Sequence, residues 1–369
     1  MRNYFKYAPA IAALSLFSQG GPVFYNFITS EPLLALRGQH QSIGDLTSGK
    51  TAGRLERIFK DEMPIRSFST GALNAISLGI FGQARKGIVA GSDNWFFSRE
   101  ELSWSRRSPE IISQNISFAK YVRQKLNSNG VQLIVVLVPE KADIYRDKLG
   151  SIRAPETRMN YYNEIYDRLK TDAGVQYIPD LRVNFLGVKD SSQLYFKSDT
   201  HWTVSGSAIA AKLVAEELAG IPNADQPKVD YIAKLGKDEM YSGDLYKFEE
   251  LSVFSSWFNL PLEKLTPITA VENSANADDI FSDTVEASKT QTAVIGTSYS
   301  ANPKWSFVEQ LKIALRADVV NLSKEGQGPF APMKNFLDND ITSYPAIEFV
   351  VWEIPVRYFD EIDFVGRNP

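Results

Sequence analysis

Apolar positions follow a repeating order along most of the chain, in which amphipathic stretches alternate with short apolar runs. Residues 108–128 carry apolar side chains at helical spacing and are followed by Asn129-Gly130, a pair that ends helices. Residues 131–138 form a continuous apolar run, which is typical of a strand buried on both faces. The same order predicts helices over 157–171, 203–218, 304–316 and 333–337, and strands over 176–178, 292–296, 318–322 and 347–352. This alternation predicts an α/β fold with a mostly parallel central sheet and helices on both faces.

Two segments depart from this order and define the expected domains. Residues 221–291 do not alternate and are expected to form an insertion with irregular structure. Residues 31–85 are polar and mixed, as in a stalk or an N-terminal layer. We therefore expect the main domain to span residues 86–369, with the insertion inside it. Within this domain, Thr203 is the expected N-cap of the helix over 203–218.

The N-terminus has the features of an export signal. Arg2 and Lys6 precede an uncharged stretch over residues 7–30, and positive residues before an apolar segment orient its N-terminus toward the cytoplasm. The stretch is long enough to cross a bilayer, which takes about 20 residues, and no clean Ala-x-Ala cleavage site follows it. We expect residues 1–30 to be an uncleaved signal anchor that holds the protein on the periplasmic side of the cell inner membrane. A cleaved signal peptide, which would leave the protein in the periplasm, is the alternative.

The composition is that of an ordinary globular protein, with 44% hydrophobic and 23% charged residues and a net charge of −4. Because there is no basic excess, a nucleic-acid partner is not expected. The chain has no cysteine, which excludes disulfides, thiolate catalysis and cysteine-ligated metals. It has two histidines, so a multi-histidine metal site is not expected either, and we predict no metal and no cofactor.

One of the two histidines, His201, lies in the most informative segment of the chain, residues 197–203. In an extended segment, side chains two positions apart point to the same side, so Asp199 and His201 can face one pocket. A carboxylate beside an imidazole fixes the tautomer of the ring and stabilises the imidazolium that forms during catalysis. An Asp-x-His pair is common, however, and on its own it is more often structural than catalytic.

A candidate nucleophile, Ser298, lies downstream at the end of a predicted strand. Gly-x-Ser-x-Ser at residues 296–300 approximates the Gly-x-Ser-x-Gly nucleophile elbow, with serine in the last place. Alone, this segment would be interpreted as a strand end with a serine helix cap, but the two motifs together favour catalysis. Ligands of open α/β sheets bind beyond the carboxyl ends of the strands, where Ser298 is expected to lie. Its N–H would there face developing negative charge.

Five sequence blocks in order resemble the alginate O-acetyltransferase family, the AlgJ/AlgX group with SGNH-hydrolase-like domains. They are Asp-Thr-His-Trp-Thr at 199–203, Gly-Thr-Ser-Tyr-Ser at 296–300 and the blocks at 138–142, 242–245 and 352–358. The resemblance implies an SGNH-hydrolase-like α/β/α sandwich. AlgX-like members carry a further C-terminal carbohydrate-binding module, for which this sequence leaves no room after the block at 352–358. Together with the hydrophobic N-terminal segment, this makes the AlgJ branch the expected one.

The resemblance also implies a catalytic triad, with Ser298 as nucleophile, His201 as base and Asp199 as orienting carboxylate. The implied activity is acetylation of hydroxyl groups of an anionic exopolysaccharide, with alginate as the first expectation, through an acetyl-serine intermediate. The implied partners are a membrane-bound O-acyltransferase as acetyl source and other proteins of exopolysaccharide acetylation and export.

Five further residues are weaker candidates for the site. Asn321, at a predicted strand end, could donate to the oxyanion, although turn capping is as good an interpretation. Lys141 and Arg357 could bind an acidic polymer, although exposed basic side chains are usually only solvated. Trp202 and Tyr299 flank the candidate catalytic residues and could stack on sugar rings, with core packing as the alternative.

Two alternatives to acetyl transfer stay open. A polysaccharide acetylesterase has the same triad but passes the acetyl group to water. A non-catalytic assembly or binding subunit of the acetylation complex keeps only the fold. The presence of Asp199, His201 and Ser298 argues against the second alternative, because a scaffold needs none of them.

Overall fold

The computed structural model describes residues 29, 31, 35, 87–222, 228–247, 261–273 and 290–361. The chain forms two compact units, one of Met1–Phe96 and Gly243–Pro261 and the other of Phe97–Ser242 and Leu262–Pro369. The predicted anchor over 1–30 and layer over 31–85 lie almost wholly outside the described residues, so this division stays a prediction. Within the described ranges, no helix is both long and apolar enough to cross a membrane.

The larger unit is built on a four-stranded parallel sheet with the strand order β3–β10–β8–β9. Its strands are β3 (Gln132–Val138), β8 (Thr292–Ile295), β9 (Val319–Asn321) and β10 (Phe349–Pro355). Trp352 of β10 pairs with Val135 of β3 and Ile295 of β8. The next residue of β10, Glu353, therefore lies beside Gly296, directly past the end of β8.

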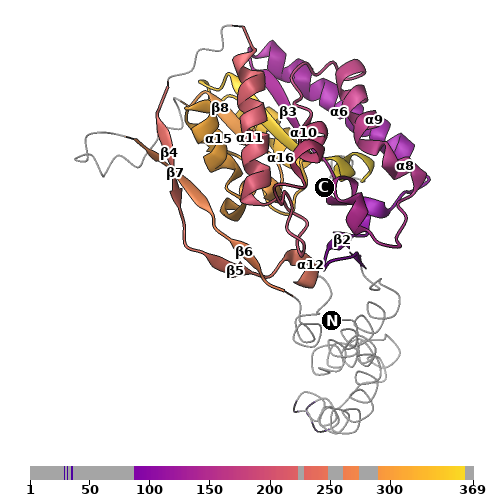
Figure 1. Cartoon of the computed structure of the whole chain (residues 1–369). Coiled ribbons are helices and arrows are strands. Elements are labelled where there is room, and N and C mark those ends of the chain that lie inside the picture. The colour runs from indigo at the N-terminus through magenta and orange to yellow at the C-terminus, as the bar shows by residue number, and fades with distance from the viewer. Residues whose placement is uncertain are drawn as a thin grey trace. The chain divides into compact units, whose positions relative to one another are not determined.

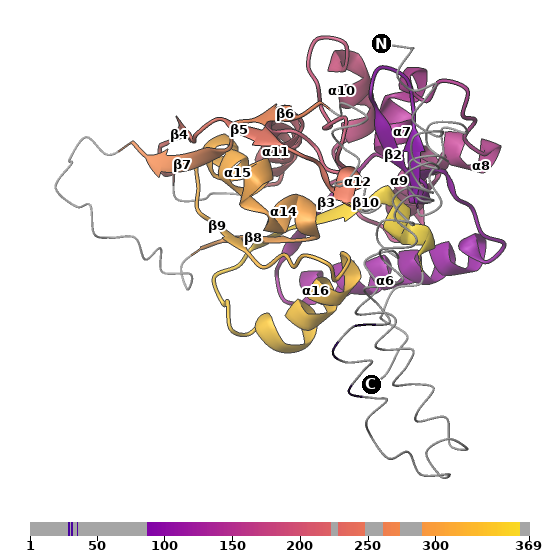
Figure 2. The ribbon, with the colours of Figure 1, turned by 90° about the horizontal axis from the view of Figure 1, so that it is seen from below.

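Helices cover both faces of this sheet, as Figure 2 shows. They are α6 (Ser108–Ser128) and α16 (Phe330–Asn335) on one side, and α11 (Val204–Ala219) and α15 (Phe307–Leu315) on the other. A further helix, α9 (Tyr161–Thr171), contributes to the same hydrophobic core as α6. On the α6 side, one hydrophobic core joins Ile116 of α6 and Met333 of α16 to alternate residues of β3 and β10. Since α11 and α15 pack against each other and α11 also contacts β3, the predicted α/β/α sandwich is confirmed.

Several helices begin and end where local sequence signals place them. α6 has Pro109 in its first turn and is closed by Asn129-Gly130, with Gly130 at a φ of 77°. Thr203 caps α11, because its side chain accepts the backbone N–H of Gly206. The helix predicted over 157–171 is instead interrupted at Asn160, between α8 (Glu156–Met159) and α9.

Other predicted elements differ from the structure. Residues 176–178 form no strand, and Tyr177 makes only an isolated parallel bridge to Ile134 of β3. The helix predicted over 304–316 is shorter: α15 follows α14 (Ser298–Ala301) and η5 (Pro303–Trp305), and Ser306 separates η5 from α15 in a left-handed conformation with a φ of 57°. A further helix, α10 (Leu181–Val188), was not predicted from the sequence. Asp180 caps it, because its side chain accepts the N–H of Val183.

The segment expected to be an irregular insertion contains paired strands in its described part. The strands are β4 (Tyr231–Leu235), β5 (Glu239–Tyr241), β6 (Glu263–Leu265) and β7 (Ile268–Glu272). β4 pairs with β7 and β5 pairs with β6, both antiparallel, so the four strands form one narrow arm. The two strand pairs follow one another along this arm (Figure 1), and β4 and β7 contact α15. The expectation of irregular structure is therefore wrong for these residues.

The remaining described elements are short. They are β1 (Ile88–Ala90), β2 (Phe96–Ser98), η1 (Glu100–Leu102), α7 (Lys141–Ile144), η2 (Arg146–Lys148), α12 (Asp244–Lys247), the π-helical turn η6 (Phe336–Asp340) and η7 (Val356–Asp360). β1 and α12 lie in the smaller unit. α7 and η7 follow the carboxyl ends of β3 and β10, so they lie at the same edge of the sheet as the turn after β8.

Candidate active site

Ser298 is the first residue of α14, in the turn that follows β8. Thr297 caps this helix, because its hydroxyl accepts the N–H of Tyr299 at 3.3 Å. Of residues 292–300, Ser298 is the only one that is not buried, since β8, Gly296, Thr297, Tyr299 and Ser300 all are. The turn therefore presents the hydroxyl of Ser298 at the carboxyl edge of the sheet.

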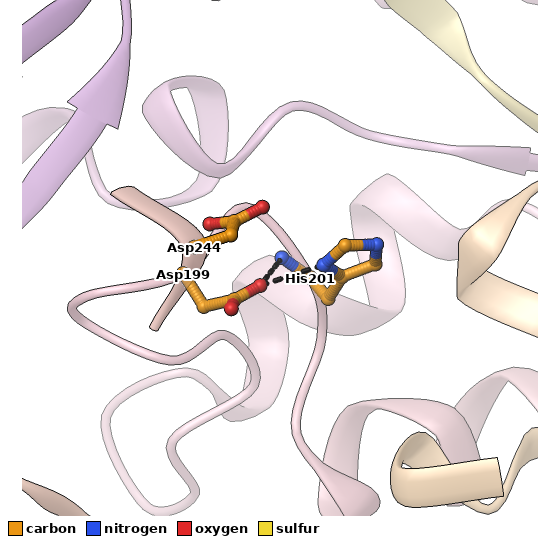
Figure 3. Close-up of side chains that lie close together, drawn as sticks. All are labelled: Asp199, His201 and Asp244. Carbon is orange, nitrogen blue, oxygen red and sulfur yellow. Dashed lines mark hydrogen bonds and ion pairs between the residues drawn. The ribbon is translucent and has the colours of Figure 1, made fainter. Parts of the chain in front are cut away.

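Asp199 and His201 lie in a turn and not in an extended segment. Oδ1 of Asp199 accepts the backbone N–H of His201 at 2.8 Å and lies 2.6 Å from Nδ1 of the same residue (Figure 3). An isolated antiparallel bridge between Tyr195 and Trp202 closes the loop around them. Local hydrogen bonding brings the two side chains together, so the expectation that alternation along a strand aligns them is wrong.

The ring of His201 connects Asp199 to Ser298. Its Nε2 lies 2.7 Å from Oγ of Ser298. An ionised carboxylate only accepts hydrogen bonds, so the proton of the neutral ring is on Nδ1, and Nε2 accepts the hydroxyl of Ser298. The structure thus brings together the three residues predicted to form the triad, in the arrangement of nucleophile, base and orienting carboxylate.

Asp199 is held in its ionised form although it is completely buried. Burial raises the pKa of its carboxyl, but the hydrogen bonds and charge of His201, together with the hydroxyl of Tyr241, outweigh this effect and hold the pKa below its ordinary value. Tyr241 donates to Oδ2, whereas His201 donates to Oδ1. Both carboxylate oxygens therefore accept hydrogen bonds.

Two aromatic residues beside the Asp199–His201 pair have no counterpart among the predicted site residues. Tyr241 ends β5, so the arm supplies a hydroxyl to Asp199. Trp305 of η5 stacks on the imidazole of His201, with ring centroids 4.9 Å apart and planes at 18°. No motif marks either residue in the sequence, and Tyr241 falls in the segment that was expected to be irregular.

A third residue absent from the sequence prediction, Glu353, lies against the turn that carries Ser298. Its carboxylate accepts the N–H of Thr297 at 2.8 Å and the hydroxyls of Thr297 and Ser300 at 3.0 Å each. Glu353 is completely buried, and burial raises its pKa to about 7 against the lowering effect of these hydrogen bonds. Its position in the block at 352–358 is its only signal in the sequence.

The two basic candidates, Lys141 and Arg357, are buried. Nζ of Lys141 donates to the carbonyl oxygens of Lys197 and Asp199 at 2.9 Å each. Arg357 is paired with Glu140, because its backbone N–H and its Nη1 donate to the two carboxylate oxygens at 2.8 and 3.2 Å. A buried charge requires such partners, and these contacts are structural and give no support to the predicted polymer-binding role of the two residues.

The three remaining candidates make contacts that agree with core packing or turn capping, the alternative interpretations of these residues. Trp202 is buried against Phe307, with ring centroids 4.9 Å apart. Tyr299 is buried and its hydroxyl donates to the carbonyl of Thr200. The side chain of Asn321 donates to the carbonyl of Ser300 at 3.0 Å and accepts the N–H of Ser323 at 3.1 Å. These contacts are those of core packing and turn capping, not of sugar stacking or oxyanion donation.

Comparison with known proteins gives one family match that spans Asp199, His201 and Ser298. Residues 88–356 match the family described as an SGNH hydrolase-like domain of the acetyltransferase AlgX. The chain is 33% identical over 316 residues to the probable alginate O-acetylase AlgJ of Pseudomonas putida, which covers 85% of this chain and 80% of that protein. It is 30% identical over 321 residues to the protein of the same name from Pseudomonas aeruginosa, with coverages of 85% and 81%.

A solved structure agrees with these sequence matches. The O-acetyltransferase domain of Pseudomonas putida AlgJ superposes with a TM-score of 0.68 at 33% identity and covers 77% of this chain and 96% of that domain. The resemblance carried by the five sequence blocks is thereby confirmed. The chain belongs to the family of SGNH hydrolase-like acetyltransferases that includes AlgX and AlgJ.

Proposed function

We propose that this protein is an O-acetyltransferase that acetylates hydroxyl groups of alginate, with Ser298, His201 and Asp199 as its catalytic triad. The observation that carries the proposal is the line of hydrogen bonds from Asp199 through His201 to Ser298, with distances of 2.6 and 2.7 Å. Family membership supports the transfer of acetyl groups, and relatives named as probable alginate O-acetylases support alginate as the acceptor.

In the first half-reaction, Ser298 attacks the carbonyl carbon of an acetyl ester. Nε2 of His201 takes the hydroxyl proton as the new bond forms, because a serine hydroxyl is a weak nucleophile without an adjacent base. The charge of Asp199 stabilises the imidazolium that results. The tetrahedral adduct then collapses: its bond to the donor oxygen breaks, His201 returns the proton to that oxygen, and acetyl-Ser298 remains.

In the second half-reaction, a hydroxyl of the acceptor sugar attacks the acetyl carbon. His201 takes the proton of this hydroxyl, and the adduct expels Oγ of Ser298, which recovers the proton. The products are the acetylated sugar and the original serine. A water molecule in the place of the sugar would give acetate, so occupation by the acceptor decides between transfer and hydrolysis.

We place this reaction on the periplasmic side of the inner membrane. The support is the sequence pattern of residues 1–30, with Arg2 and Lys6 before an uncharged stretch. In that compartment the proposed acetyl source is a membrane-bound O-acyltransferase, which acts with other proteins of alginate acetylation and export. Cell fractionation and sequencing of the mature N-terminus test this placement, and a mature N-terminus near residue 20 would contradict the uncleaved anchor.

Turnover of p-nitrophenyl acetate by the purified full-length protein tests the triad. We expect release of p-nitrophenolate and, by intact mass, a transient acetyl adduct. Both are expected to disappear in Ser298→Ala and to persist in Ser117→Ala, which alters an exposed serine of α6. Ester cleavage at the wild-type rate in Ser298→Ala would refute the mechanism.

Adding alginate to the same reaction tests the acceptor. Transfer predicts O-acetyl groups on the polymer, detected by NMR, and a matching decrease in the acetate released. If acetate is released at the same rate with and without alginate and the polymer stays unmodified, the acetylesterase alternative is favoured. A protein that never cleaves any acetyl ester would favour the assembly subunit.

A further inference from the structure

Glu353 is a buried acid whose side-chain hydrogen bonds, among the described residues, all reach the turn that carries Ser298. It lies in β10, between β3 and β8, and has no exposed surface. Burying a carboxylate is unfavourable unless hydrogen bonds or a counter-charge compensate it. Within the part of the chain that the structure describes, no lysine or arginine forms an ion pair with Glu353. Its donors there are the N–H and hydroxyl of Thr297 and the hydroxyl of Ser300.

These donors lie on both sides of the candidate nucleophile. Thr297 directly precedes Ser298, and Ser300 follows it by two residues. Oε2 of Glu353 accepts the N–H of Thr297 at 2.8 Å and the hydroxyl of Ser300 at 3.0 Å, and the hydroxyl of Thr297 lies 3.0 Å from both carboxylate oxygens. A carboxylate suits this set because it accepts at both oxygens. One side chain of the central strand therefore fixes the turn before and after Ser298.

The same contacts account for the sequence of the turn. The last position of the Gly-x-Ser-x-Gly elbow is a serine here, and the hydroxyl that Ser300 adds is the one that donates to Glu353. The first glycine, Gly296, is needed for space. A Cβ at this position would lie 2.5 Å from Oε2 of Glu353 and 2.9 Å from its Cβ, closer than side chains approach one another.

We infer that Glu353 is a positioning residue for acetyl transfer, which holds Thr297 and Ser300 so that Oγ of Ser298 stays within hydrogen-bonding distance of His201. This inference rests on the proposed role of Ser298 as nucleophile. A misplacement of about 1 Å can lower the rate of such a reaction about 100-fold. Because Glu353 is buried away from the ester, its loss affects the rate of acetylation of Ser298 and not the binding of the ester.

Ser300→Ala is the central test, because it removes one donor to Glu353 and leaves the triad intact. With p-nitrophenyl acetate and the full-length protein, we expect kcat to fall about 10-fold with an unchanged KM. Ser108→Ala is the matched control. Ser108 is likewise a buried serine whose hydroxyl donates to a buried carboxylate, that of Asp360, at 3.1 Å. This control is expected to keep the wild-type kcat.

Pairs of substitutions at the same position, one that keeps a hydrogen-bonding group and one that removes it, show whether loss of hydrogen bonding causes the loss of activity. Thr297→Ser keeps the hydroxyl and should retain most of the activity, whereas Thr297→Val loses it and should be impaired. Glu353→Gln keeps one acceptor oxygen and should be more active than Glu353→Leu. Thermal unfolding of each variant verifies that it is folded at the assay temperature.

The outcomes separate this inference from the proposed function. Wild-type kcat in both Ser300→Ala and Thr297→Val would overturn the role of Glu353, as would an equal loss in Ser108→Ala. In either result the wild type would still turn over the ester through Ser298, so the proposed function would stand. Absence of turnover that depends on Ser298 in the wild type would overturn both.

Discussion

The hydroxyl of Tyr241 is the contact of the active site that is most directly open to test. It reaches Asp199 from the arm, whereas the three residues of the proposed triad come from the sheet edge and the loop before α11. Tyr241→Phe removes this hydroxyl and keeps the ring, which packs against Phe196 and Trp305. The substitution therefore isolates one hydrogen bond to Oδ2 of Asp199.

The size of the effect follows from the burial of Asp199 and from the bonds that remain. After the substitution, Oδ1 still accepts the backbone N–H and Nδ1 of His201 at 2.8 and 2.6 Å, while Oδ2 loses the phenolic donor. A hydrogen bond to a charged group contributes about 1.5–3 kcal/mol, and about 1.4 kcal/mol corresponds to tenfold in rate. Complete loss of this hydrogen bond in the transition state alone would lower kcat about 10- to 100-fold. Because the free enzyme loses the same bond, we expect about 10-fold.

The assay is the rate of acetyl-enzyme formation with p-nitrophenyl acetate, followed by stopped flow. Tyr231→Phe is the matched control, because Tyr231 also belongs to the arm and donates its hydroxyl to a carboxylate, that of Asp318. Asp318 lies outside the triad, so this variant is expected to keep the wild-type rate. Equal rates for Tyr241→Phe and the wild type would refute the reasoning, and so would equal losses in the two tyrosine variants.

Three further predictions concern the surroundings of the triad. Trp305→Leu removes the ring that stacks on His201 and should lower kcat about threefold, because a cation–π contact contributes about 0.5–1 kcal/mol; an unchanged kcat in the same assay would contradict this. Gly296→Ala places a Cβ against Glu353 and should lower the free energy of unfolding by about 1–3 kcal/mol in urea titrations. Gly187→Ala, where a Cβ meets no atom within 4 Å, is the control and should not lower the free energy of unfolding. Burial raises the pKa of Glu353 from 4.5 to about 7, so the stability it contributes is complete below the pKa of the unfolded chain and is lost as the pH rises through about 7. As the pH rises from 4.5 to about 7, the unfolding free energy of the wild type should therefore fall relative to that of Glu353→Gln. A constant difference between the two proteins would show that the pKa of Glu353 is not raised.

The grouping of Asp199, His201 and Ser298 could be predicted because its two halves are local structures. Asp199 and His201 are joined by a turn in which one side chain bonds to a residue two positions away, and such a turn needs only a short motif. The nucleophile turn needs only a strand end, a close approach at Gly296 and a cap. Tyr241, Trp305 and Glu353 belong to other elements, and no local pattern distinguishes an aromatic or acidic residue that faces the site from one that packs elsewhere.

The elements of the fold also divide into those that local sequence signals predict and those that they do not. α6 could be placed to the residue because both its ends carry local signals. The break at Asn160 and the left-handed Ser306 have no such signal, and they shorten two predicted helices. The arm could not be predicted from alternation, because β4 is exposed over nearly its whole length and, among the described strands, pairs only with β7. A strand without a buried face lacks the period-two pattern from which strands are predicted.

Two buried charged residues hold the two loops of the proposed triad against neighbouring strands of the sheet. Lys141 follows β3 and donates to the carbonyls of Lys197 and Asp199, which fixes the loop of the acid and the base. Glu353 lies in β10 and fixes the turn of Ser298. β3 and β10 are neighbours that pair along their whole length. His201 and Ser298, which are 97 positions apart in the chain, are therefore supported from two neighbouring parts of the sheet. The sequence suggested that Lys141 is exposed, where it could bind an acidic polymer or only be solvated, because an isolated lysine is usually exposed. It did not mark Glu353 as a site residue. A buried charge near a predicted site is better interpreted first as a support for the loops that carry the catalytic groups.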